Sequence, residues 1–144
     1  RKYPALTAGS WAAEEIPPDA FPSDPEILYV LGQLRQEQGD LPGARRLWEE
    51  ALTEDPGHPE SLADLGAVRL MEGDTAAALD HLIAAVRGRP TLASAWYALA
   101  RIHLARGERA QGVRALRNFV HHAGSRYPDQ VQWARRILRE RGGI

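Results

Sequence analysis

The sequence predicts an all-α protein, a solenoid of three helix-turn-helix repeats followed by a C-terminal capping helix. Three observations support this fold class. The chain resembles itself at a spacing of 34 residues, apolar residues recur at helical intervals inside each copy, and glycine and proline separate these stretches at fixed positions. With 144 residues, 44% hydrophobic and 26% charged, the composition is that of one ordinary globular domain.

The internal repeat is visible without gaps. Residues 25–58 and 59–92 are identical at 11 of 34 aligned positions. The shared positions include Gly32 and Gly66, Gly39 and Gly73, Ala44 and Ala78, Ala51 and Ala85, and Pro56 and Pro90. A third, looser copy is expected over residues 93–126, with Trp96, Leu99, Ala100, Gly107 and Leu116 in register.

Each copy is predicted to contain two helices. In the first copy, apolar residues from Ile27 to Leu34 lie at helical spacing, and the pair Gly39-Asp40 ends this helix. A second periodic stretch runs from Ala44 to Leu52 and ends before Pro56, because the residue preceding a proline is pushed out of the α region. We expect Asp40 and Asp74 to cap the second helices of their repeats.

The pattern of each copy is similar to the tetratricopeptide repeat. That family places a large apolar residue at position 4, Leu-Gly at positions 7 and 8, and Ala, a large residue, Ala and Pro at positions 20, 24, 27 and 32. The first copy supplies Leu28, Leu31-Gly32, Ala44, Trp48, Ala51 and Pro56; the second supplies Leu62, Leu65-Gly66, Ala78, Leu82, Ala85 and Pro90. The resemblance covers residues 25–124 and implies a right-handed superhelix.

The third copy departs from the family pattern. It keeps Trp96, Leu99-Ala100 and Leu116, but has Gly112, Phe119 and Gly124 where the family has Ala, Ala and Pro. Position 11, often Tyr in the family, is Arg35, Arg69 and His103. We therefore expect different packing around the last turn of this repeat.

The two ends of the chain differ from the repeats. Residues 127–144 contain an amphipathic stretch from Val131 to Leu138 and are predicted to form a capping helix and a tail. Residues 1–24 form an acidic, proline-rich leader with scattered apolar side chains at Trp11, Ile16 and Phe21. Two interpretations of the leader stay open: a linker, or an extended segment that docks on a helical surface of its own chain or of a neighbouring chain.

The sequence predicts no catalytic residue, metal site or cofactor. Cysteine is absent, which excludes disulfides and thiolate ligands and leaves the cell compartment open. Adjacent histidines such as His121 and His122 point apart on a helix, and His58, His81 and His103 lack ligand partners at metal spacing. No apolar run approaches the roughly 20 residues of a membrane span. Because the chain starts at Arg1, we expect that a preceding segment is missing.

The resemblance implies a concave groove lined by the first helix of each repeat. In this sequence the predicted groove residues are Tyr29, Gln33, Ala63, Ala67, Leu70, Tyr97, Arg101 and Leu104. The tyrosines would serve as amphipathic anchors, or else pack on neighbouring helices, and Arg101 would bind a carboxylate. The clamp with which some family members hold acidic chaperone tails requires Lys and Asn, which these positions lack.

The expected partner is therefore another protein or a peptide, held by a non-catalytic scaffold or adaptor. Charge is unevenly distributed: residues 1–72 carry 6 basic and 14 acidic side chains, a balance of −8, and residues 73–144 carry 12 basic and 5 acidic, a balance of +7. The basic half makes nucleic-acid binding the less favoured alternative. A regulatory domain of a larger enzyme, and self-association through the leader, are further alternatives.

Overall fold

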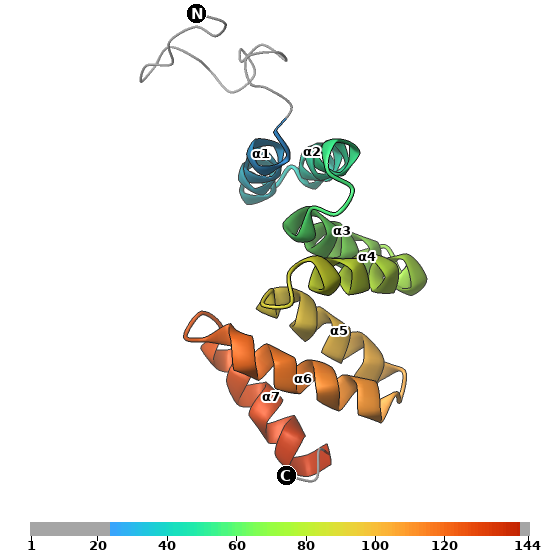
Figure 1. Ribbon diagram of the computed structural model, residues 1–144, viewed down its shortest axis with the longest axis vertical. Helices are drawn as coiled ribbons and strands as arrows, with labels where there is room; N and C mark the ends of the chain where they lie inside the picture. The colour runs from blue at the N-terminus through green and yellow to red at the C-terminus, as the bar shows by residue number, and fades with distance from the viewer. Residues whose placement is uncertain (1–23, 142–144) are drawn as a thin grey trace, which may run out of the picture.

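The computed structural model describes residues 24–141, which form seven α-helices and no β-strand (Figure 1). The helices are α1 (Pro25–Glu37), α2 (Leu41–Glu54), α3 (Pro59–Met71), α4 (Thr75–Gly88), α5 (Ala93–Ala105), α6 (Arg109–Ala123) and α7 (Pro128–Arg141). Each helix contacts the next along the chain, so the helices stack from one end of the molecule to the other. The predicted all-α repeat solenoid is confirmed. The docking hypothesis for the leader concerns residues 1–23, which lie outside the described part.

The turn inside each of the first two repeats follows from two residues. Gly39 and Gly73 have φ of 82° and 83°, a conformation that favours glycine, and each ends the first helix of its repeat. The next residue caps the second helix: Asp40 accepts a hydrogen bond from the backbone N–H of Gly43, and Asp74 accepts one from Ala77. The predicted caps are therefore confirmed.

The two helices of the first repeat approach closely at one point. Trp48 of α2 is fully buried, and its indole Nε1 donates to the backbone carbonyl of Tyr29 at 3.2 Å. A Cβ atom at Gly32 would lie 2.3 Å from the same indole nitrogen. Glycine is thus required at this crossing, where the tryptophan ring lies against the backbone of α1.

In the third repeat, the glycine at the close contact lies on the second helix of the pair instead of the first. Here Gly112 of α6 lies beneath Leu104 of α5, and a Cβ atom at Gly112 would come within 2.6 Å of a Leu104 methyl group. Phe119, where the other repeats have alanine, is buried against Tyr97 and Tyr127, with ring centroids 5.0 and 6.0 Å away. The third repeat therefore packs its helices with Gly112 and Phe119 where the first two repeats use alanine, as the departure from the family pattern predicted.

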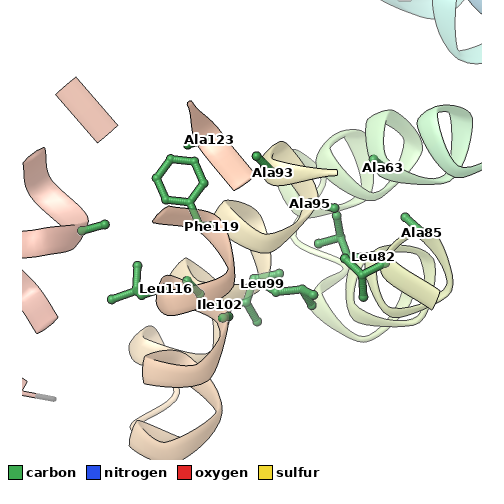
Figure 2. Close-up of a cluster of buried hydrophobic side chains, with 14 of the residues drawn as sticks. Ala63, Leu82, Ala85, Ala93, Ala95, Leu99, Ile102, Leu116, Phe119 and Ala123 are labelled. Carbon is green, nitrogen blue, oxygen red and sulfur yellow. The ribbon is translucent and has the colours of Figure 1, made fainter. Parts of the chain in front are cut away.

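The apolar core forms two clusters of unequal size. The larger runs through α3 to α7 and includes Leu82, Leu99, Leu116 and Phe119 (Figure 2). The smaller joins the first two repeats and consists of Ala44, Trp48, Leu65 and Val68. The core is therefore thinner at the N-terminal end of the stack.

That end also exposes apolar side chains on α1. Val30 is 45% exposed and Leu34 is 48% exposed, whereas Val68 and Ile102, which occupy the position of Leu34 in the later repeats, are buried. The later residues are covered by the preceding repeat, and no described helix precedes α1.

The last helix, α7, packs on α6 with one face. It buries Val131, Ala134 and Leu138, while Arg135, Arg136 and Arg139 are exposed, as the amphipathic pattern predicted. Among the helices of residues 24–141, none is both long enough and apolar enough to cross a lipid bilayer.

Candidate functional site

Seven of the eight predicted groove residues reach the surface of the first helices α1, α3 and α5. We call these the first-helix surface: Tyr29, Gln33, Ala67, Leu70, Tyr97, Arg101 and Leu104. Gln33, Ala67 and Arg101 are exposed, and the other four are half-buried. The eighth, Ala63, is only 6% exposed because it belongs to the larger core cluster. It therefore offers little contact area to a ligand.

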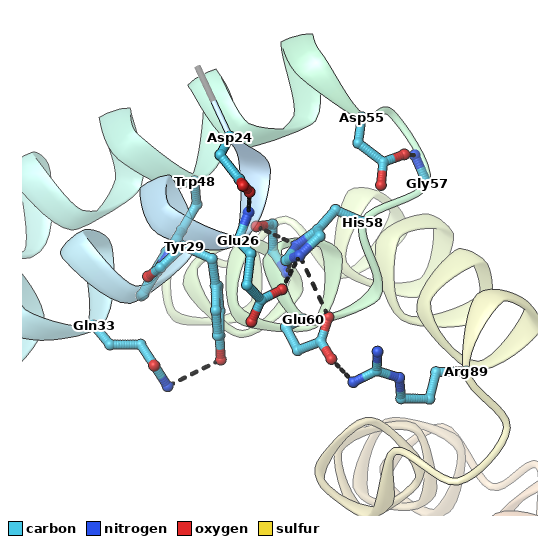
Figure 3. A network of polar contacts seen from close by, with 11 residues as sticks. Asp24, Glu26, Tyr29, Gln33, Trp48, Asp55, Gly57, His58, Glu60 and Arg89 are labelled. Atoms are coloured by element: carbon cyan, nitrogen blue, oxygen red, sulfur yellow. Dashed lines mark hydrogen bonds and ion pairs between the residues drawn. The ribbon is translucent and has the colours of Figure 1, made fainter. Parts of the chain in front are cut away.

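Tyr29 packs on neighbouring helices, which is one of the two roles that the sequence left open. Its ring packs inside the protein, with centroids 6.4 Å from Trp48 and 5.6 Å from His58. Its hydroxyl accepts a hydrogen bond from Nε2 of Gln33 at 3.0 Å (Figure 3). Burial, and then the charge of the nearby Asp64 carboxylate, raise the pKa of Tyr29, so this hydroxyl keeps its proton.

Asp64 on α3 is a half-buried acidic residue, one turn before Ala67, that the sequence analysis did not single out. Burial raises the pKa of its carboxyl group to about 6, and the nearby Tyr29 hydroxyl only partly offsets this effect. The residue lies between Ala63 and Leu65 and occupies the repeat position of Val30 and Ala98. An acidic residue at a position that is apolar in the other two repeats is the sequence signal that could have identified Asp64.

Tyr97 forms the centre of a second group on α5. Its ring lies 5.0 Å from that of Phe119 and 5.7 Å from that of Trp133 on α7, and the guanidinium carbon of Arg101 lies 5.8 Å from its centroid. This cation–π contact holds Arg101 beside the aromatic residues while its side chain stays exposed. Trp133 was not predicted here, because contacts between α7 and α5 cannot be deduced from periodicity.

A polar network joins the first two repeats next to Tyr29 (Figure 3). His58 is 5% exposed and caps α3: its Nδ1 accepts from the backbone N–H of Ser61 at 3.3 Å, so the proton is on Nε2. Nε2 lies 2.9 Å from a carboxylate oxygen of Glu26 and 3.6 Å from one of Glu60. Glu60 in turn forms an ion pair with Arg89.

This network corrects one prediction. The sequence analysis found no ligand partners for His58, yet the ligand atoms of Glu26, His58 and Glu60 lie within 4.8 Å of one another. The repeat brings together residues that are 32 positions apart. Every member is already engaged, however, with both imidazole nitrogens hydrogen-bonded and Glu60 paired with arginine. We therefore interpret the group as a connection between repeats.

Arginines of α6 and α7 lie together on another part of the surface. Arg109, Arg114, Arg117 and Arg141 line an open depression of about 720 Å³ between α6 and α7. This depression shares no residue with the first-helix surface, but Leu104 of that surface lines a smaller hollow together with Arg109 and Arg141.

Seven helices with a 34-residue period define an α-helical repeat protein. Models of the tetratricopeptide repeat match residues 19–59, 29–93 and 93–118. The chain therefore belongs to the tetratricopeptide repeat family. Proteins of this family are generally non-catalytic scaffolds for protein–protein interactions.

Relatives share the repeat over part of their length. The chain is 31% identical over 93 residues to human tetratricopeptide repeat protein 7A and 32% identical over 90 residues to human tetratricopeptide repeat protein 7B. These matches cover 65% and 62% of this chain but 11% of each human protein. The "Probable biofilm formation methyltransferase WspC" of Pseudomonas putida is 36% identical over 58 residues, which cover 40% of this chain and 14% of that protein. The chain thus corresponds to a small fraction of each relative.

Proposed function

We propose that this chain is a non-catalytic protein-interaction module, and that its first-helix surface binds an extended peptide or a helix of a partner protein. The family supports protein partners in general. We choose this surface because of the arrangement of its side chains. Exposed or half-buried residues recur on three successive first helices, and they mix aromatic, amide, apolar and guanidinium groups.

The chemistry of this surface suits a polypeptide. Half-buried tyrosines on α1 and α5 offer apolar rings together with hydroxyls that can form hydrogen bonds. Ala67 on α3 is exposed and small, so it leaves space for a ligand between the two tyrosines. Gln33 and Arg101 add groups that can bind backbone carbonyls or carboxylates.

A peptide selection tests this proposal. We would display random dodecapeptides on phage, select them against the full chain, and measure the affinity of enriched peptides by fluorescence anisotropy. Ala67→Arg should weaken binding at least tenfold, because it fills the first-helix surface with a long side chain. Ala76→Arg is the matched control, since Ala76 is an exposed alanine on α4 of the same repeat.

Two results would overturn the proposal. One is a selection that enriches no peptide. The other is binding that Ala67→Arg leaves unchanged; loss of binding on replacing Arg114 with Gln would then place the partner on the basic depression of α6 and α7.

A further inference from the structure

We propose that the arginine-lined depression between α6 and α7 is a second binding surface, one that takes an acidic segment of a partner polypeptide. We call it the basic depression, and its lining residues are Arg109, Ala110, Val113, Arg114, Arg117, Asn118 and Arg141. It lies on the second helix of the third repeat and on α7. The proposal is therefore independent of the one made for the first-helix surface.

The fold brings these arginines together from two helices. Arg109 is the first residue of α6, and Arg141 is the last residue of α7. Nε of Arg109 donates a hydrogen bond to the backbone carbonyl of Arg141, so the two helix ends meet although 32 positions separate them. Arg114 and Arg117 follow on α6 and lie three positions apart, which makes them neighbours on the helix surface.

The basic depression contains no carboxylate. Its lining residues are arginines, alanine, valine and asparagine, and α6 itself has no acidic residue. Glu140 lines the smaller adjoining hollow, but in residues 24–141 it forms no ion pair. The ion pairs of these residues also leave out Arg109, Arg114 and Arg141. These three guanidinium groups thus have no carboxylate partner within the described helices.

The pair Arg114 and Arg117 is a feature of the third repeat. The corresponding pairs in the first two repeats are Arg46 with Glu49 and Asp80 with Ile83. Like charges one turn apart on a helix repel each other, and a cation at the first position of a helix opposes the helix dipole. A bound anion would reduce both effects, so its binding would gain energy beyond the direct contacts.

The chemistry of the lining favours carboxylates of a polypeptide. Guanidinium groups bind carboxylates and phosphates through paired N–H donors. No aromatic residue lines the basic depression, so the bases of a nucleic acid would find no ring to stack on. Exposed Ala110 lies in the same depression and offers apolar contact to a neighbouring side chain of a peptide.

The length of the arginine row also suits a short peptide segment. Arg109 and Arg117 are separated by a helical rise of about 12 Å. An extended polypeptide covers this length with about four residues. Binding of duplex DNA instead depends on many phosphate contacts along the backbone, and so short a row supplies few of them.

Fluorescence anisotropy on the full chain tests the proposal with three labelled probes. They are a dodecapeptide of alternating glutamate and alanine, the same peptide with glutamine in place of glutamate, and a short DNA duplex of mixed sequence. The measurements are made at low ionic strength, where exposed charges are weakly screened. We expect the glutamate peptide to bind at least tenfold more tightly than the glutamine peptide, and more tightly than the duplex.

A pair of double variants locates the binding site. Arg109→Gln/Arg114→Gln should weaken binding of the glutamate peptide at least fivefold, because it removes two charged donors from the basic depression. The matched control is Arg135→Gln/Arg136→Gln, which removes the same charge from exposed positions of α7 outside that depression. The control should change the affinity less than twofold, and circular dichroism should show that both variants are folded.

Three results would overturn the proposal. Equal losses in the two double variants would show that the peptide responds to net charge alone. A duplex that binds more tightly than the glutamate peptide and loses affinity in Arg109→Gln/Arg114→Gln would make the depression a nucleic-acid surface. Loss of the glutamate peptide in Ala67→Arg, with none in Arg109→Gln/Arg114→Gln, would place it on the first-helix surface. If instead the peptide selection enriches nothing but the glutamate peptide behaves as expected, the basic depression stands without the first-helix surface.

Discussion

A half-buried carboxylate lowers the stability of this fold at neutral pH, and Asp64 shows how the cost arises. Water solvates the ionised group in the unfolded chain, whereas α3 places it beside the apolar ring of Tyr29. The equivalent residues Val30 and Ala98 have no charge, so the repeat itself does not need an acid at this position.

The first prediction at this scale concerns stability against pH. The pKa of Asp64 rises from an ordinary 3.8 to about 6 on folding, so the folded state binds the proton more tightly than the unfolded state. The resulting stabilisation is fully present below pH 3.8 and is lost as the pH rises through 6. Between pH 4 and pH 7 the contribution of this group to the free energy of unfolding should fall by about 1–3 kcal/mol.

Urea denaturation of the unmodified chain and of Asp64→Asn at a series of pH values measures this effect. The asparagine side chain of the variant has no proton to lose, so the stability difference between the two proteins should move in favour of the variant as the pH increases. Asp80→Asn should show no such trend, because the Asp80 side chain is exposed. If the free energies of unfolding of Asp64→Asn and of the unmodified chain changed with pH in the same way, Asp64 would be well solvated in the folded protein.

At the scale of single helices, periodicity and turn chemistry predict most of the fold. The caps at Asp40 and Asp74 and the glycine turns depend on residues within a few positions of one another, so they can be predicted from the local sequence. Contacts between successive repeats are different. Tyr29 with Asp64, and Glu26 with His58, join side chains one repeat apart whose orientations depend on how the helices stack. Spacing alone does not provide that information.

The second prediction concerns α7 as a cap for the last repeat. This helix covers α6 with Val131, Ala134 and Leu138, and its Trp133 packs on Tyr97. Deleting residues 127–144 should expose this part of the core, lower the melting temperature by several degrees and cause self-association. Circular dichroism melting and size-exclusion chromatography measure both effects, with deletion of 142–144 as the control. An unchanged melting temperature and a monodisperse truncated chain would show that α7 is not a cap.

At the scale of the whole molecule, stability should be unevenly distributed along the stack. The larger core cluster extends over α3 to α7, whereas four residues form the cluster that joins the first two repeats. In a repeat protein each unit is stabilised by its own packing and by its neighbours, so a unit with a small interface can open separately. The exposed Val30 and Leu34 on α1 contribute little to that interface.

The final prediction is that α1 and α2 exchange their amide hydrogens faster than α5 and α6. Hydrogen exchange followed by mass spectrometry measures this for each helix under native conditions. Trp48→Ala should accelerate exchange in α1 and α2 further and leave α5 and α6 protected, because Trp48 belongs to the smaller cluster. Leu116→Ala, in the larger cluster, should lower protection in α5 and α6 by the roughly 2–5 kcal/mol typical of a buried leucine. Equal exchange in all helices of the unmodified chain would mean that the repeats unfold as one unit. The first-helix surface, which extends from α1 to α5, would then open only on global unfolding.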